Sequence, residues 1–314
     1  MNDTCFIGAV EAIIGDRVFM SDARIAVFAI ILSVAALSLG DAVIKATGLS
    51  LPLWQMFILR SSIVVPILLW LARRKGPIAV TNIGWAALRS ALLVLMWLSY
   101  YSALPLMPLS LAAAAYYTGP LFIVALAAAV RRTLPPCRAI LAIAAGFAGV
   151  LLVIRPDTSG MTLGTLLPVA AAFLYACAMV LTSAKCREDD PFVLALALNA
   201  AFIVSGALLG LFSGQDGSFI FGPWQAVDLR LLTTVAALAV LILIGSVGAA
   251  VAYQKGPPNT VAAFDYSYLV FSLVWGGLFF AELPSIAGLV GVSIIATAGL
   301  LALPASRQER ANEL

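Results

Sequence analysis

The sequence predicts an all-α integral membrane protein in which ten transmembrane helices form two inverted five-helix repeats. Of its 314 residues, 63% are hydrophobic and 11% are charged, whereas a soluble domain is about half apolar and a quarter charged. Ten apolar runs have lengths suited to a bilayer core, which needs about 20 helical residues. Five runs lie in each half of the chain, and an odd number of spans turns homologous halves upside down relative to each other.

The predicted spans are apolar runs bounded by proline, glycine and charged clusters. They cover, in order, residues 24–44, 51–72, 83–103, 106–130, 136–154, 161–183, 191–212, 230–252, 258–280 and 285–303. The first repeat is 24–154 and the second is 161–303, joined by a loop at 155–160. Residues 1–23 form a cytoplasmic N-terminal segment, in which Met20 is a second plausible start, and 304–314 form a cytoplasmic tail.

The distribution of basic residues predicts the orientation. With the N-terminus inside, 13 Lys and Arg residues fall on the cytoplasmic side and three on the opposite side. Because short cytoplasmic loops are enriched in Lys and Arg, we expect both termini to be cytoplasmic. The first 23 residues do not resemble a signal peptide, because acidic residues interrupt the apolar stretch and no basic segment precedes it. We expect a multi-pass protein of the bacterial inner membrane.

The composition also excludes several classes of function. The chain has no histidine, so it lacks a His-dependent nucleophile, general base or metal ligand. Its four cysteines form no CxxC pair, and a net charge of +3 without a basic run does not favour nucleic-acid binding. We therefore expect no enzyme activity, cofactor, metal or nucleic-acid partner. The expected partners are a small-molecule substrate and the lipid bilayer, and the protein is expected to be a monomer.

A shift of 150 residues indicates an internal repeat. The shift superposes Pro108 on Pro258 and Tyr116 on Tyr266, together with several alanines and glycines. These matches fall at corresponding places in the fourth and ninth predicted spans. Internal inverted repeats of this kind are typical of secondary transporters.

Four features together indicate a family resemblance. They are the paired-repeat layout, Arg60 inside the second span, the run Ala112-Ala-Ala-Ala-Tyr-Tyr-Thr-Gly-Pro120, and the junction Phe280-Ala-Glu-Leu-Pro284 followed by Gly291 and Gly299. In these features the chain resembles the drug/metabolite transporter superfamily, within it the EamA-type ten-helix transporters, and most closely the YddG-like amino-acid exporters. It departs from the family pattern at Arg132, where the repeat would have Glu, and at Val270, where it would have Pro. The resemblance implies a basket-like bundle without a cofactor, its central cavity lined mainly by spans 1, 3, 4, 6, 8 and 9.

A charged side chain inside a span is expected to have a structural or functional role, since its insertion into the bilayer costs about 2.5–3.5 kcal/mol. Arg60 lies deep in the second span, where it either ties helices together or serves in gating or substrate binding. Asp265 in the ninth span is expected to bind a substrate ammonium, carry a coupling proton or pair with Arg60. We expect Asp41 to pair with Lys45 one turn later, and Arg89 to extend to the cytoplasmic interface.

Aromatic residues in the middle of spans predict an amphipathic cavity. Interfacial aromatic residues gather at span ends, whereas several tyrosines here lie well inside. A buried tyrosine hydroxyl needs a polar partner, so these side chains should face the bundle interior. For each tyrosine taken alone, helix packing is the more common explanation, whereas the cluster as a whole favours a cavity. The predicted substrate-binding residues are Trp97, Tyr101, Tyr116, Tyr117, Tyr175, Asp265 and Tyr266.

Helix-breaking and small residues predict hinges. Proline removes a helical hydrogen bond, and small residues allow close helix approach. Gly119 and Pro120 in the fourth span, and Gly245 and Gly248 in the eighth, are therefore candidate hinges for alternating access. Tight helix packing is the competing interpretation of the same residues.

These observations predict a secondary transporter of a small metabolite, and the leading hypothesis is export of amino acids, including aromatic or other amphipathic ones. The alternative is an importer or exchanger of a vitamin, nucleoside or similar metabolite with the same fold. A channel or an intramembrane enzyme is a distant alternative. The chain has no phosphate-binding loop, so ATP is not expected to drive transport directly.

Overall fold

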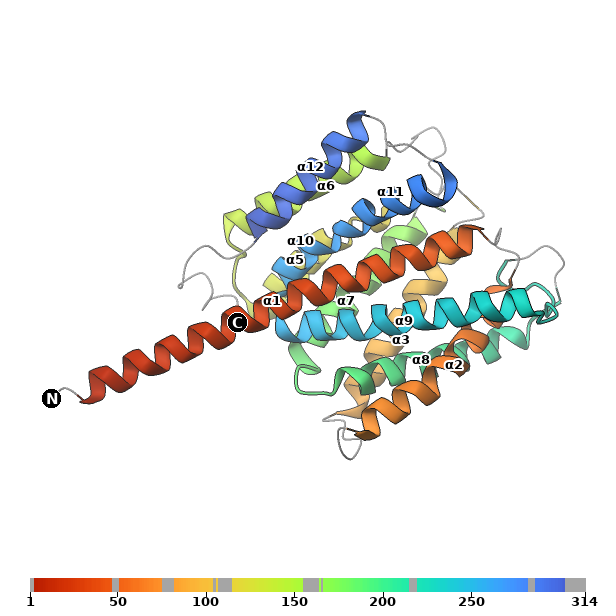
Figure 1. The fold of residues 1–314 in the computed structure, drawn as a ribbon, viewed down its shortest axis with the longest axis horizontal. Helices are drawn as coiled ribbons and strands as arrows, with labels where there is room; N and C mark the ends of the chain where they lie inside the picture. Colours follow the sequence, from red (N-terminus) through yellow and green to blue (C-terminus); the bar gives the residue numbers. More distant parts are fainter. Residues whose placement is uncertain are drawn as a thin grey trace.

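The structure is a computed structural model that describes residues 3–46, 51–74, 82–103, 106, 115–154, 164, 166–214, 219–281 and 286–302 (Figure 1). Its helices are α1 (Asp3–Ala46), α2 (Leu53–Arg74), α3 (Ile83–Ala103), α5 (Gly119–Arg131), α6 (Cys137–Ile154), α7 (Leu166–Lys185), α8 (Pro191–Gly210), α9 (Leu229–Lys255), α10 (Pro258–Asp265), α11 (Ser267–Phe280) and α12 (Ile286–Ala302). No strand occurs within the described ranges. The predicted loop 155–160 and tail 304–314 lie outside them, as do most of the fourth-span alanine run and Glu282 to Pro284.

Each predicted span contains a described helix, and α10 and α11 together occupy the ninth. Within the described residues, seven segments are long and apolar enough to cross a bilayer, and the segment Pro258–Phe280 counts as one of them. Helices α5, α6 and α12 are apolar but shorter. The first helix begins at Asp3, earlier than the predicted start at residue 24, since no proline interrupts the preceding segment. Its membrane-length part is Asp22–Ile44.

The ninth span is two helices rather than the continuous helix predicted from its apolar run. The hydroxyl of Ser267, the first residue of α11, donates to the carbonyl oxygen of Phe264 in α10 at 2.6 Å. The amide of Leu269 then bonds to the carbonyl of Tyr266 three residues back, at 3.1 Å. A tight turn at Tyr266 therefore separates α10 from α11 and sets Asp265 at the end of a helix.

Side-chain caps define the starts of two other helices. Asp190 precedes α8 and accepts a hydrogen bond from the amide of Phe192 at 2.8 Å, and Pro191 fills the first helical position. Asp228 caps α9 in the same way, accepting from the amide of Leu231 at 2.7 Å. The chain therefore starts both helices with residues that satisfy otherwise unpaired backbone amides.

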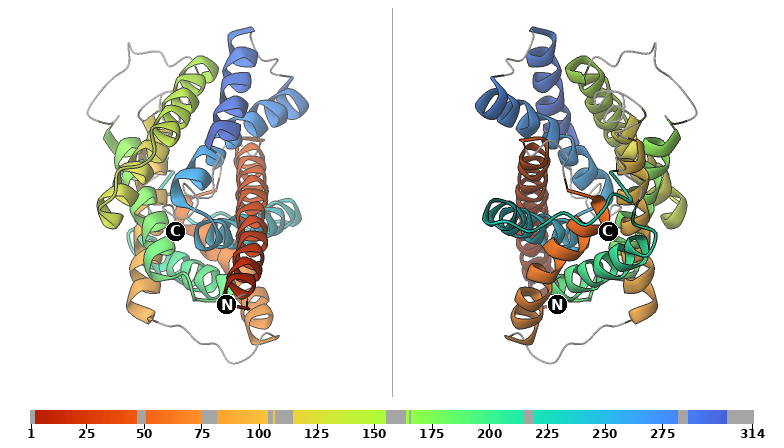
Figure 2. Two further views of the ribbon diagram at one scale, coloured as in Figure 1. Left: turned by 90° about the vertical axis from the view of Figure 1, so that its left-hand side faces the viewer. Right: turned by 90° about the vertical axis from the view of Figure 1, so that its right-hand side faces the viewer.

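Helices from the first half of the chain pack against helices from the second half. The main neighbours are α1 with α9, α6 with α12, α2 with α8, and α3 with α7. Smaller contacts join α1 with α11, α5 with α7, α3 with α8, and α5 with α10. Figure 1 and both views of Figure 2 place the α6–α12 pair on one side of the bundle and the α2–α8 pair on the other. Between them, α1, α3, α5, α7, α9, α10 and α11 surround the centre.

The outer surface is strongly apolar. Phe28, Leu141 and Leu278 are each more than 60% exposed, and many other large apolar side chains accompany them on the outward faces of the helices. A soluble monomer rarely exposes contiguous apolar patches this extensive. Together with the apolar helices, this surface indicates a multi-pass membrane protein.

Candidate functional site

A cavity of about 520 Å³ lies at the centre of the bundle. Six helical segments supply most of its wall: α1, α3, α5 with the residues just before it, α7, α9, and α10 with α11. These are the spans that the family resemblance placed around a cavity, and Leu198 of α8 joins them. Six of the seven predicted substrate-binding residues line this cavity: Trp97, Tyr101, Tyr116, Tyr117, Tyr175 and Asp265. We call this space the central cavity.

The aromatic wall of the central cavity is a connected set of rings. Trp97 and Tyr101 stack, with centroids 5.2 Å apart and planes 18° from parallel. Tyr100 contacts Tyr116 at a centroid distance of 5.1 Å. Tyr100, which was not predicted as a site residue, also lines the central cavity. An extended aromatic surface of this kind suits a planar ring, which stacks favourably on tyrosine and tryptophan.

Tyr266 does not line the central cavity, contrary to prediction. Its side chain is fully buried against α6, where its hydroxyl lies 3.5 Å from the carbonyl oxygen of Ile143. A Cβ placed on Gly146 would come within 2.5 Å of the Tyr266 ring, so the ring fills a notch that only glycine leaves open. The turn between α10 and α11 directs Tyr266 toward α6, and Tyr268 two residues later faces the cavity instead.

Two carboxylates face the central cavity, each beside a tyrosine. Asp265 interacts with Tyr175 of α7. Asp41 of α1 accepts a hydrogen bond from the hydroxyl of Tyr268 of α11. The side chain of Lys45, the predicted partner of Asp41, lies outside the described residues. The cavity therefore presents acidic hydrogen-bonding groups at two places on an otherwise aromatic and aliphatic wall.

Arg60 lies behind the cavity wall. It is 4% exposed, and its guanidinium stands over the rings of Phe202 at 4.9 Å and Phe57 at 5.7 Å. The acidic residue that interacts with it electrostatically is Asp41, whereas pairing with Asp265 was one of the predicted alternatives. Its Nε and Nη2 atoms have no hydrogen-bond partner within the described part of the chain. Arg60 thus lies between α2 and α8, outside the lining of the central cavity, and both of its predicted roles stay predictions.

Arg89 corrects a second expectation. It was predicted to extend to the interface, but it is 1% exposed and forms part of the central cavity wall. Its Nε donates to the hydroxyl of Thr182 on α7 at 2.7 Å, and its Nη1 approaches the carbonyl oxygen of Leu194 on α8 at 3.5 Å. The sequence signal that could have revealed this role is the threonine on the facing helix, whose hydroxyl provides an acceptor inside the bundle.

Three of the four predicted hinge residues, Gly119, Pro120 and Gly245, line the central cavity. The fourth, Gly248, packs closely against α1, and a Cβ there would lie 2.9 Å from the carbonyl oxygen of Ala29. The hydroxyl of Ser33 also donates to the carbonyl of Gly245 at 2.7 Å, joining α1 to α9. Close helix contact is thus evident at both glycines of α9, and their predicted hinge motion stays a prediction.

Comparisons with known proteins bear on the class of function. No family model matches the chain, so its membership of the drug/metabolite transporter superfamily stays a prediction. The chain is 27% identical over 256 residues to a riboflavin transporter of Brucella anthropi, covering 79% of this chain and 84% of that one. It also superposes on a solved crystal structure with a TM-score of 0.74 at 20% identity, covering 90% of this chain and 96% of the other.

These similarities and the apolar helical bundle support a membrane transporter of a small metabolite. A transporter relative also agrees with the expectation that the protein is not an enzyme. The comparison gives no support to amino-acid export, the leading hypothesis from the sequence. It fits the vitamin alternative better.

Proposed function

We propose that this protein is a secondary transporter that moves a neutral, planar ring metabolite of the vitamin type, with riboflavin the first candidate, by alternating access. The observation that carries this proposal is the stacked aromatic wall of the 520 Å³ central cavity. Cavities of about 300–1,000 Å³ accommodate ligands of this size class. The similarity to a riboflavin transporter supports the same substrate class.

The charges on the cavity wall favour a neutral ring over an amino acid. A zwitterion brings a carboxylate that needs a cationic partner, because a buried unpaired charge is costly. Arg89 is the only Lys or Arg among the described residues that line the cavity, and its Nε is already bonded to Thr182. Asp265 and Tyr175 suit the hydroxyl groups of a sugar-alcohol side chain, which both donate and accept hydrogen bonds.

The pattern of helix pairs supports ten spans in two inverted repeats. The repeat relation exchanges the first span with the sixth (α7) and the third with the eighth (α9). Accordingly, the pairing of α1 with α9 corresponds to that of α7 with α3. Two further main pairs, α2 with α8 and α6 with α12, join a helix to its own counterpart, and the smaller contact of α5 with α10 does the same. We place this bundle in a bacterial inner membrane with both termini in the cytoplasm, as a monomer that encloses the whole cavity.

Counterflow in proteoliposomes tests the proposal. Vesicles preloaded with unlabelled riboflavin should transiently accumulate labelled riboflavin, whereas vesicles preloaded with an amino-acid mixture should not accumulate labelled amino acids. Trp97→Ala should raise the half-saturating riboflavin concentration about tenfold, since an aromatic stacking contact contributes about 0.5–1.5 kcal/mol beyond buried area. Trp70→Ala is the matched control, because Trp70 lies on the outer face of α2, 53% exposed.

Amino-acid counterflow without riboflavin counterflow would overturn the proposed substrate class.

A second arm of the experiment, with an imposed pH gradient, tests whether Asp265 carries a coupling proton. Gradient-driven accumulation that disappears in Asp265→Asn, while counterflow persists, is the result expected of a proton carrier. Accumulation insensitive to the gradient would exclude that role.

A further inference from the structure

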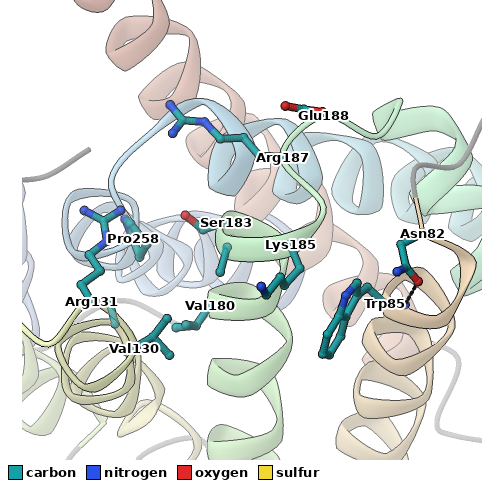
Figure 3. Close-up of a pocket in the computed structure, with 12 residues that line it drawn as sticks. Asn82, Trp85, Val130, Arg131, Val180, Ser183, Lys185, Arg187, Glu188 and Pro258 are labelled. Atoms are coloured by element: carbon teal, nitrogen blue, oxygen red, sulfur yellow. Dashed lines mark hydrogen bonds between the residues drawn. The ribbon is translucent and has the colours of Figure 1, made fainter.

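A second cavity, of about 610 Å³, opens at the end of the bundle predicted to face the cytoplasm. It lies between the last turns of α5 and α7 and the first turns of α3 and α10, and we call it the basic vestibule. Its described lining residues are Asn82, Trp85, Ala127, Val130, Arg131, Val180, Ser183, Ala184, Lys185, Arg187, Glu188 and Pro258. Figure 3 shows Arg131 beside Pro258 on one side, Trp85 on the other, and Lys185 between them.

The basic vestibule leads toward the central cavity along the same helices. On α3, Trp85 lines the vestibule and Arg89, one turn further, lines the central cavity. On α7, Val180 and Met179 line the vestibule and the central cavity, respectively. A hydrogen bond of 2.7 Å from Arg89 to Thr182 joins these two helices at the end of the central cavity nearest the vestibule. The basic vestibule thus lies at the predicted cytoplasmic end of helices α3 and α7, which also line the central cavity.

The vestibule combines cations with an aromatic wall. Lys185 stands over the ring of Trp85, with its Nζ 5.8 Å from the centroid, and Arg187 lies at the rim beside Glu188 (Figure 3). Among the described residues, neither Lys185 nor Arg187 forms an ion pair with a carboxylate. Arg131 adds a third cation from α5. Among the described lining residues cations thus outnumber carboxylates, and Lys185 and Arg187 carry charge that no described carboxylate pairs, which favours an anion.

The central cavity has the opposite electrostatic character. Asp41 and Asp265 face it, and Arg89 is the described cation on its wall. A dianionic group would meet two carboxylates there, and like charges in a low-dielectric site repel strongly. The two cavities therefore differ in the charge that they accept, although one follows the other along the same helices.

We propose that the basic vestibule is a binding site for a phosphate ester of a planar ring metabolite, and that the ester binds there without passing through the central cavity. Lys185 binds the phosphate, Trp85 beside it contacts the ring, and Arg187 adds positive charge at the rim. The second part rests on the proposed function, because it concerns passage of a transported solute. An ester bound in the vestibule covers the exit from the central cavity, and so inhibits transport of the neutral ring from this side alone.

Direct binding tests the site independently of transport. The full-length protein in nanodiscs of phosphatidylcholine is titrated with riboflavin 5′-phosphate, whose fluorescence reports binding. The double variant K185Q/R187Q should bind it about tenfold more weakly, since exposed charge contacts each contribute up to about 1 kcal/mol. The matched control is R73Q/R74Q, which removes the same charge near the same end but outside the vestibule. Trp85→Ala should weaken binding of the ester and leave competition by inorganic phosphate unchanged.

Several results would overturn this site. Equal affinity in the wild type and K185Q/R187Q would show that these cations do not hold the phosphate. An equal loss in both double variants would indicate a general charge effect rather than a site. In a second arm, nanodiscs contain phosphatidylglycerol; if this lipid abolishes binding of the ester, the vestibule is a site for lipid headgroups instead.

A transport arm tests the second part. Riboflavin 5′-phosphate added on the vestibule side should inhibit riboflavin counterflow in the wild type and in R73Q/R74Q, but much less in K185Q/R187Q. The labelled ester itself should show no counterflow, and its accumulation would refute the exclusion by the central cavity. If the wild type exchanges no riboflavin, the proposed function fails, while the binding titrations still decide whether the vestibule holds the ester.

Discussion

Replacing Gly146 with alanine perturbs the turn that places Asp265 in the cavity wall. The new Cβ would lie 2.5 Å from Cδ2 and Cε2 of Tyr266, whereas carbon atoms in contact prefer about 3.5–4.0 Å. The ring must therefore move by about 1 Å. Because Tyr266 directly follows Asp265, this movement displaces a carboxylate of the central cavity. Overpacking of a dense core typically costs about 1–3 kcal/mol.

Gly40→Ala is the matched control, because a Cβ on Gly40 would meet its nearest atom at 3.9 Å, an ordinary contact. Both glycines lie inside helices, so the gain of about 1 kcal/mol in helix propensity from alanine is common to both variants. Gly146→Ala should consequently be less stable than Gly40→Ala by about 1–3 kcal/mol. Unfolding in mixed micelles measures this difference, and riboflavin counterflow measures the expected rise in half-saturating concentration for Gly146→Ala alone. Equal stability and equal half-saturation in the two variants would refute the reasoning.

Three further predictions concern other described contacts. Tyr268→Phe removes the hydroxyl that donates to Asp41, so half-saturation of counterflow should rise severalfold without loss of folded protein in size-exclusion chromatography. Thr182→Val leaves the Nε of buried Arg89 without its acceptor, so it should lower the free energy of unfolding by about 1–3 kcal/mol. Thr182→Ser keeps the hydroxyl and should have the stability of the wild type. A valine variant as stable as the wild type would contradict this. Cys137 is an exposed free cysteine, so an impermeant maleimide should label it in inverted but not right-side-out vesicles if the predicted orientation is correct.

The residues of the central cavity that the sequence predicts are polar side chains in the middle of spans, which would have no hydrogen-bond partner if they faced lipid. Aromatic residues such as Tyr116 and Tyr175 lie mid-span, and burial of a hydroxyl in lipid is costly enough to predict that they face inward. Asp265 was predicted for the same reason. These arguments need only the depth of a residue in its span, which the apolar runs define to within a turn.

The predicted positions of Arg89 and Tyr266 were wrong because they depend on the direction in which each side chain points, which the depth of a residue in its span does not determine. Arg89 lies about six residues from the predicted end of its span, a depth from which a long side chain reaches either the interface or the interior. Thr182 provides the acceptor that decides for the interior, but it is 93 residues away in the chain. Tyr266 was predicted on the assumption of a continuous ninth helix. Instead α10 ends before Tyr266, whose ring packs against α6 beside Gly146.

The predicted internal repeat agrees with the pairing of helices in the bundle, but it does not account for the side chains that line the central cavity. The 150-residue shift relates Tyr116 to Tyr266, yet one lines the central cavity and the other is buried against α6. The same shift relates Asp265 to Ala115, so the carboxylate has no counterpart in the first half. Equivalent helices thus present different groups to a shared centre. The other carboxylate of the cavity wall, Asp41, is not related to Asp265 by this shift either. A wall built this way orients an asymmetric solute, which a fully symmetric wall would bind in two directions equally.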